Sequence, residues 1–175
     1  GRYGGTVVIG LPKDHGDLAA IDPAELADAL AFLRRRLTGD YPVDDFGFDA
    51  DLTDHVLLPV LRPDDRIWVQ DYHLFPLAAE LRALGVENPI GHFLHIPFPG
   101  PADCAALPNP TQLFDWLSHY DLLGFQAERD LGAFAESARQ LADGDQVAPD
   151  RFRLSGRMVR TQVFPIGIDA AAFIT

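Results

Sequence analysis

The fold of this chain is decided by residues 67–74, which read Ile67-Trp68-Val69-Gln70-Asp71-Tyr72-His73-Leu74. The first four residues are rich in β-branched and aromatic side chains and predict a strand, in which we expect Trp68 to be a core residue. The apolar spacing from Leu74 to Leu84 predicts a helix, and Gly85 is a natural residue to end it. The apolar run from Ile90 to His95 predicts a second strand. A strand, a helix and another strand in this order are typical of a parallel sheet.

The same alternation continues toward the C-terminus. The spacing predicts a short helix over Thr111–Leu117, a strand over Leu122–Phe125 and a helix over Arg129–Leu141. Two short strands are predicted near Phe152–Leu154 and Met158–Phe164. This pattern predicts an α/β protein with a Rossmann-like, mostly parallel sheet and helices on both faces.

Toward the N-terminus the pattern is less regular. Thr6–Leu11 predicts another buried strand, and Asp22 is placed to cap a leucine-striped helix that runs to Leu37. Residues 39–54 are rich in Asp, Gly and Pro, which predicts a connecting loop. We expect residues 1–175 to form a single domain, because this length suits one core.

Composition excludes several classes of protein. Apolar residues make up 47% of the chain and charged residues 23%, as in a soluble globular domain. The net charge of −12 argues against nucleic acid and anionic membranes as partners. Cys104 is the single cysteine, so neither an internal disulfide nor a cysteine-based zinc site is expected. No apolar run approaches the roughly 20 residues of a membrane span, which makes the cytoplasm the expected location.

Polar residues follow three of the predicted strands. Asp71, Tyr72 and His73 come after the first, His95 closes the second, and Gln126 follows the third. Because the carboxyl ends of parallel strands meet at one edge of a sheet, we expect these side chains to line a ligand-binding crevice.

Plainer roles exist for the same residues. Asp71 could cap the helix that follows it, and His95 could be a hydrogen-bonded core histidine. His92 lies three residues before His95, so the two point to opposite faces of the strand and at most one faces the crevice. The histidines show no standard zinc spacing, and we expect no metal site.

Four long motifs resemble the trehalose-6-phosphate synthases, glycosyltransferase family 20. Residues 67–74 are similar to the family's WVHDYHL motif and residues 93–99, Phe-Leu-His-Ile-Pro-Phe-Pro, to its FLHIPFP motif. Residues 120–126, Tyr-Asp-Leu-Leu-Gly-Phe-Gln, are similar to YDLIGFQT, and residues 165–169 to PIGID. The resemblance covers residues 56–174.

The resemblance implies the N-terminal half of a GT-B glycosyltransferase, in which two Rossmann-like domains face each other across a cleft. Such enzymes transfer glucose from UDP-glucose to glucose 6-phosphate with retention of configuration in trehalose biosynthesis, without a metal or another cofactor. By match to the motifs, His95 and Asp71 would be catalytic. Tyr72, His73 and Gln126 would line the acceptor side.

The chain also departs from the family pattern. The glycine-rich loop and the LWPLFHY segment have no counterpart, Gln70 replaces a histidine, and His92 replaces a phenylalanine. The family's donor phosphates are bound by an Arg and a Lys of the second domain. We therefore expect residues 1–55 to be divergent, the C-terminal donor-binding domain to be absent from these residues, and the chain to be inactive alone.

Other functions fit the same motifs. The acceptor could differ, as in glucosylglycerol-phosphate synthases or pseudo-glycosyltransferases of this family. A non-catalytic domain that binds a sugar phosphate or a partner chain is the alternative from another class. The expected ligands are a sugar phosphate and a nucleotide sugar, and the sequence leaves a homo-oligomer open.

Overall fold

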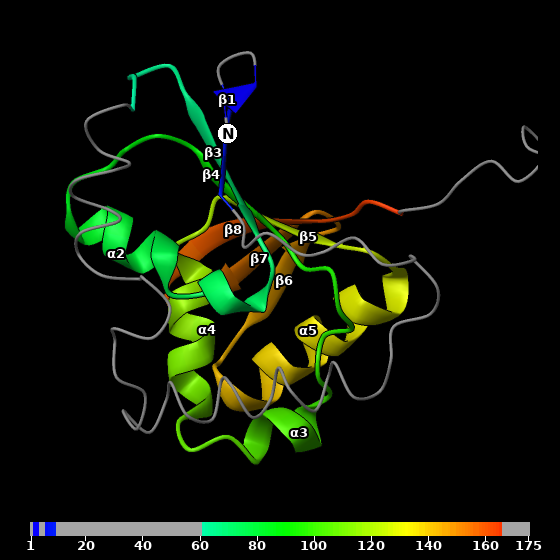
Figure 1. Ribbon diagram of the computed structural model, residues 1–175. Coiled ribbons are helices and arrows are strands. Elements are labelled where there is room, and N and C mark those ends of the chain that lie inside the picture. Colours follow the sequence, from blue (N-terminus) through cyan, green and yellow to red (C-terminus); the bar gives the residue numbers. More distant parts are fainter. Residues whose placement is uncertain (1, 4–5, 10–60, 166–175) are drawn as a thin grey trace, which may run out of the picture.

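The computed structural model describes residues 2–3, 6–9 and 61–165 of the chain (Figure 1). Their strands are β1 (Arg2–Tyr3), β2 (Thr6–Ile9), β3 (Arg66–Gln70), β4 (Ile90–Phe93), β5 (Leu122–Phe125), β6 (Asp145–Ala148), β7 (Arg151–Leu154) and β8 (Arg157–Val163). Their helices are the 3-10 turn η4 (Tyr72–Leu74), α2 (Leu77–Ala83), α3 (Pro101–Ala105), α4 (Pro110–Ser118) and α5 (Glu128–Leu141).

The strands form one mixed sheet in the order β1-β2-β3-β4-β5-β8-β7-β6. Its centre is parallel, because β2, β3, β4, β5 and β8 all run in the same direction. The antiparallel pairs lie at the edges: β1 on β2 at one end, and β7 and β6 beyond β8 at the other. The predicted Rossmann-like, mostly parallel α/β fold is confirmed. The expected helices on both faces of the sheet are not found in the described residues, whose helices all lie on one face.

The described helices lie on one face of this sheet (Figure 1). α2 contacts α4, α4 contacts α5, and α5 contacts α3. The reason is topological: from β2 to β8 the parallel strands are added in chain order in one direction, and right-handed crossovers then bring each helix to the same side. The helix predicted up to Leu37 and the loop predicted over 39–54 lie outside the described residues.

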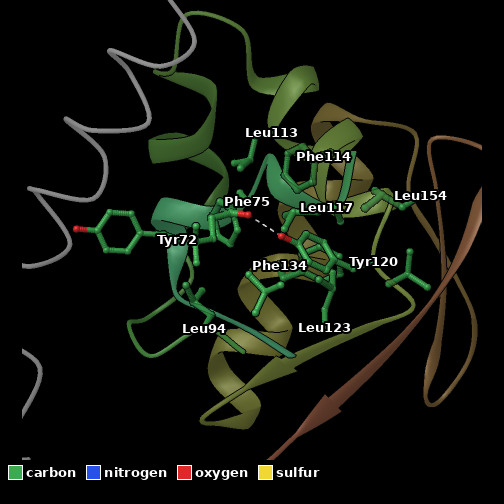
Figure 2. Close-up of a cluster of buried hydrophobic side chains, with 14 of the residues drawn as sticks. Tyr72, Phe75, Leu94, Leu113, Phe114, Leu117, Tyr120, Leu123, Phe134 and Leu154 are labelled. Carbon is green, nitrogen blue, oxygen red and sulfur yellow. Dashed lines mark hydrogen bonds between the residues drawn. The ribbon is translucent and has the colours of Figure 1, made fainter. Parts of the chain in front are cut away.

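The main core lies between this face and the helices. Every second strand residue points into it, among them Ile67, Val69 and Leu123, each at most 2% exposed. Aromatic rings from α4 and α5 pack above them, and Figure 2 shows Phe114 and Phe134 in this cluster. The cluster is aromatic and closely packed, which fixes the spacing between sheet and helices.

The second face of the sheet carries a smaller aromatic cluster made of Trp68, Phe93 and Phe164. The rings lie over Gly91 and Gly124, where a Cβ atom would meet Trp68 at 2.4 Å and Phe93 at 2.8 Å. From the sequence we expected Trp68 to be core. That expectation is wrong in part: Trp68 lies on the sheet as predicted, but it is only partly buried and faces away from the helices.

Several elements differ from the sequence prediction. The helix expected from Leu74 is split into η4 and α2 because Pro76 has no amide hydrogen for an uninterrupted helix. Helix α3 was not predicted; its first residue is Pro101, and proline is favoured at that position. The edge strand β6 was not predicted, since Asp145 and Gln146 give it little apolar pattern.

Candidate active site

The carboxyl ends of β3, β4 and β5 lie side by side, because these strands are neighbours in the sheet. Asp71 follows β3 directly, His95 follows β4 by two residues, and Gln126 follows β5 directly. The parallel topology therefore brings the three predicted strand-end groups to one rim. We call this the β3–β5 rim.

Asp71 has an unusual backbone conformation. Its φ is 73° and its ψ is 161°, a backbone conformation that residues other than glycine rarely adopt. Its amide donates to the Phe93 carbonyl at 2.8 Å, and its carbonyl accepts from His92 Nε2 at 2.9 Å and from the Leu74 amide at 3.2 Å. These bonds stabilise the conformation and direct the chain sharply away from the strand.

The carboxylate of Asp71 is buried at the start of η4. Its Oδ1 accepts from the Tyr72 amide at 3.0 Å, so the plainer capping role that we considered is present in the structure. Capping occupies one carboxylate oxygen and is compatible with a role at the rim. The residue is 5% exposed, so its carboxyl group lies in a region of low dielectric.

His95 is held from both neighbouring strands. Its Nε2 lies 2.5 Å from Gln70 Oε1 at the end of β3, and its carbonyl accepts from Gln126 Nε2, also at 2.5 Å. The edge of its ring packs against Phe93, with the ring centroids 4.8 Å apart. His95 is therefore a half-buried rim residue with a fixed ring and a fixed main chain.

Tyr72 and His73 lie in η4 beside Asp71. Their rings are tilted against each other with centroids 3.8 Å apart. Tyr72 is 8% exposed and belongs to the same buried cluster as Phe114 and Phe134, and Figure 2 shows its ring at the edge of that cluster, directed away from those two rings. Both residues lie in the turn that follows the rim residue Asp71, and Gln126 contacts the His95 main chain.

His92 lies on the face of the sheet that the helices cover. Its ring packs between the rings of Phe75 and Tyr120, each with its centroid 5.0 Å away. Burial lowers the pKa of His92 from 6.5 to about 4, against the opposing effects of the Asp71 carbonyl bond and the Asp71 carboxylate. The ring is therefore neutral near pH 7 and donates its Nε2 hydrogen to Asp71. His92 and His95 therefore lie on opposite faces of the sheet, as their spacing predicts: His92 packs against core rings, whereas His95 contacts Gln70.

Sequence reasoning missed the contacts of Gln70 and His92. Gln70 is the residue just before the Asp71 motif, and His92 is in register with Val69 beside it. Both residues differ from the family motifs, and this difference was the only sign in the sequence that they matter. It did not show which residues they contact.

Within residues 2–3, 6–9 and 61–165, no cluster of three or more His, Cys, Asp or Glu side chains could hold a metal ion. In the same residues, no helix is both long and apolar enough to cross a membrane.

The parallel sheet with polar groups at the ends of adjacent strands defines a Rossmann-like α/β protein, a class in which ligands bind at the carboxyl edge of the sheet. A sequence model of glycosyltransferase family 20 matches residues 49–175. The chain therefore belongs to glycosyltransferase family 20.

The chain is also similar to curated proteins that are named as trehalose-6-phosphate synthases. The chain is 49% identical over 113 residues to a trehalose-6-phosphate synthase of Klebsiella pneumoniae, covering 65% of this chain and 24% of that protein. It is 44% identical over 147 residues to a trehalose-6-phosphate synthase of Sinorhizobium fredii, covering 83% and 30%. The chain thus spans less than a third of the length of these relatives.

Solved structures show the same fold. An α,α-trehalose-phosphate synthase from Burkholderia xenovorans in complex with glucose-6-phosphate matches with a TM-score of 0.61 and 35% identity, over 85% of this chain and 30% of that one. The E. coli protein bound with UDP-2-fluoro glucose matches with a TM-score of 0.62 and 37% identity, over 89% and 31%.

Proposed function

We propose that this chain forms the N-terminal, acceptor-side part of a retaining glycosyltransferase that moves glucose from UDP-glucose to glucose 6-phosphate. In this reaction the bond from the anomeric carbon to UDP breaks, a bond to an acceptor hydroxyl forms, and the hydroxyl proton is released. The observation that carries the proposal is the placement of Asp71 and His95 on one rim, each held by several hydrogen bonds. Membership of glycosyltransferase family 20 supports it.

The geometry fits the charges of such a transition state. The anomeric carbon gains positive charge as UDP departs, and the buried carboxylate of Asp71 would stabilise that charge. His95 would bind a hydroxyl on the 6-position side of the donor glucose with its ring and support the reacting carbon with its carbonyl. Fixed dipoles and a carboxylate would supply the stabilisation, and we propose no metal or other cofactor.

The remaining predicted residues fit supporting roles. We propose that Tyr72 and His73 line the acceptor side from η4. Gln126 would act there mainly by holding the His95 carbonyl, which its amide nitrogen contacts.

We also propose that the donor diphosphate is bound by a second domain that these residues do not provide. The chain spans 24% and 30% of the two curated relatives, which supports this division. A diphosphate leaving group needs cationic partners, and among the described residues none of the groups at the β3–β5 rim is an arginine or a lysine.

A segment exchange tests the proposed function. Residues 61–165 would replace the matching segment of the Klebsiella pneumoniae relative, and UDP release would be measured with UDP-glucose and glucose 6-phosphate. We expect the chimera to be active and the same chimera with His95→Ala to lose at least a hundredfold in kcat, a typical effect of removing one transition-state contact.

The outcomes separate the alternatives. A folded chimera that turns over only another sugar phosphate or polyol phosphate would identify a different acceptor. A folded chimera without turnover, together with glucose 6-phosphate binding by the 175-residue chain, would favour the non-catalytic binding domain. Normal turnover in the His95→Ala chimera would contradict the assignment of His95.

A further inference from the structure

Gln70 contacts His95 from an adjacent strand. It is the last residue of β3, it is partly buried, and it pairs in register with Phe93 of β4. Alternation along β3 places it on the second face of the sheet with Trp68, away from the helices. Its Oε1 lies 2.5 Å from His95 Nε2, within hydrogen-bond distance.

The chemistry of this contact determines where the histidine carries its proton. An amide oxygen can only accept a hydrogen bond, so the nitrogen that faces it must donate. Nε2 of His95 is therefore the protonated nitrogen of the neutral ring, and Nδ1 carries the lone pair. Gln70 thus selects one of the two tautomers.

The contacts around His95 restrict the orientation of its ring. The rings of Phe93 and His95 form a T-shaped pair, and Gln126, directly after β5, contacts the His95 carbonyl. Two glutamine side chains, one at the end of β3 and one directly after β5, therefore hold the residue, one through its ring and one through its main chain. Gln126 belongs to the proposed site already, whereas nothing so far assigns a role to Gln70.

We infer that Gln70 is a positioning residue that fixes the tautomer and the ring orientation of His95. In the Nε2–H tautomer, Nδ1 is the nitrogen able to accept a hydrogen bond from a sugar hydroxyl. This consequence for catalysis rests on the proposed function, while the tautomer itself does not.

The tautomer is measured on the 175-residue chain without any substrate. Long-range proton–nitrogen spectra of the imidazole rings at pH 8 distinguish a protonated ring nitrogen from one with a lone pair, and His95→Asn assigns the signals. We expect Nε2–H in the native chain, a mixture of tautomers in Gln70→Met, and Nε2–H again in Gln70→Glu, which keeps an acceptor oxygen. A native ring protonated at Nδ1 would overturn the inference even if the variants did not fold. So would an unchanged spectrum in Gln70→Met.

The segment-exchange chimera tests the consequence for catalysis. We expect Gln70→Met to lower kcat by roughly ten- to a hundredfold, as when a group that orients a functional histidine is removed, with a smaller change in KM. The matched control is Gln162→Met, an exposed amide of β8 in register with Gly124, which should leave kcat unchanged.

The two proposals fail in different ways. An inactive chimera with Nε2–H spectra in the native chain would contradict the proposed function alone. An active chimera whose kcat does not respond to Gln70→Met would contradict the positioning role alone.

Discussion

Asp71 combines a strained main chain with a buried carboxylate. A residue with this φ and ψ costs on the order of 1–3 kcal/mol relative to a relaxed conformation. The hydrogen bonds to Phe93, Leu74 and His92 offset this cost, and of these partners only His92 contributes a side chain. The neutral His92 ring is therefore part of what holds the proposed catalytic carboxylate at the β3–β5 rim.

His92 should make stability depend on pH. Its pKa is lowered from 6.5 to about 4, so between these values the unfolded chain binds more protons than the folded chain. The free energy of unfolding should then fall as the pH is lowered from 7 to 4, by about 3 kcal/mol from this residue. We expect His92→Phe to remove this part of the pH dependence, measured by urea unfolding at several pH values.

His119 provides the comparison. Its pKa is also lowered by burial, but its side chain is less buried than that of His92. His119→Phe should therefore change the slope of stability with pH less than His92→Phe does. Equal slopes in the native chain and in His92→Phe would contradict the assignment of a buried neutral ring.

A buried hydrogen bond joins the η4 turn to the end of α4. The Tyr120 hydroxyl donates to the Leu74 carbonyl at 2.6 Å, as the dashed line in Figure 2 shows. Burial raises the pKa of Tyr120, so the hydroxyl keeps its proton across the ordinary pH range. We expect Tyr120→Phe to lower the free energy of unfolding by about 1–2 kcal/mol, because a buried carbonyl loses a partner. An unchanged urea midpoint would show that this bond contributes nothing.

The packing of β4 on the second face requires a glycine. A Cβ at Gly91 would lie 2.4 Å from the Trp68 ring, and both atoms belong to adjacent parallel strands. We expect Gly91→Ala to lower the free energy of unfolding by about 1–3 kcal/mol through displacement of the ring. Urea unfolding followed by tryptophan fluorescence measures both the stability and the environment of the ring.

Gly132 in α5 is the matched control, since a Cβ there meets nothing within 4 Å. Gly132→Ala should raise the free energy of unfolding by about 0.5–1 kcal/mol, because alanine loses less conformational freedom in a helix. If both substitutions stabilised the chain, the close contact between Gly91 and Trp68 would be wrong.

For the chain as a whole, the proposed division of labour predicts binding without turnover. The 175-residue chain should release no UDP from UDP-glucose and glucose 6-phosphate above the level of its own His95→Ala variant. The reason is that the leaving diphosphate would lack the cationic partners that we propose a second domain provides. UDP release that depends on His95 in this chain would contradict that proposal.

The sequence predicted much of the fold because its signals are local. Short apolar runs and helical spacing predict β3, β5, β7 and α5. Their observed bounds differ from the expected ones by at most one residue. The edge strand β6 and the split before α2 were missed, since a polar edge strand has little pattern and a proline can begin a helix as well as break one.

The sequence by itself determined the parallel α/β class, the family, and the presence of Asp71, His95 and Gln126 at one rim. Parallel strands end at the same edge, so order along the chain is sufficient for that conclusion. Only the tertiary structure decided that Gln70 holds His95, that His92 holds the main chain of Asp71, and that Trp68 faces away from the helices. These facts depend on strand register and side-chain direction between residues more than twenty positions apart, as for the pair Gln70 and His95. Alternation along one strand gives the face on which a residue lies, but it does not give its partner.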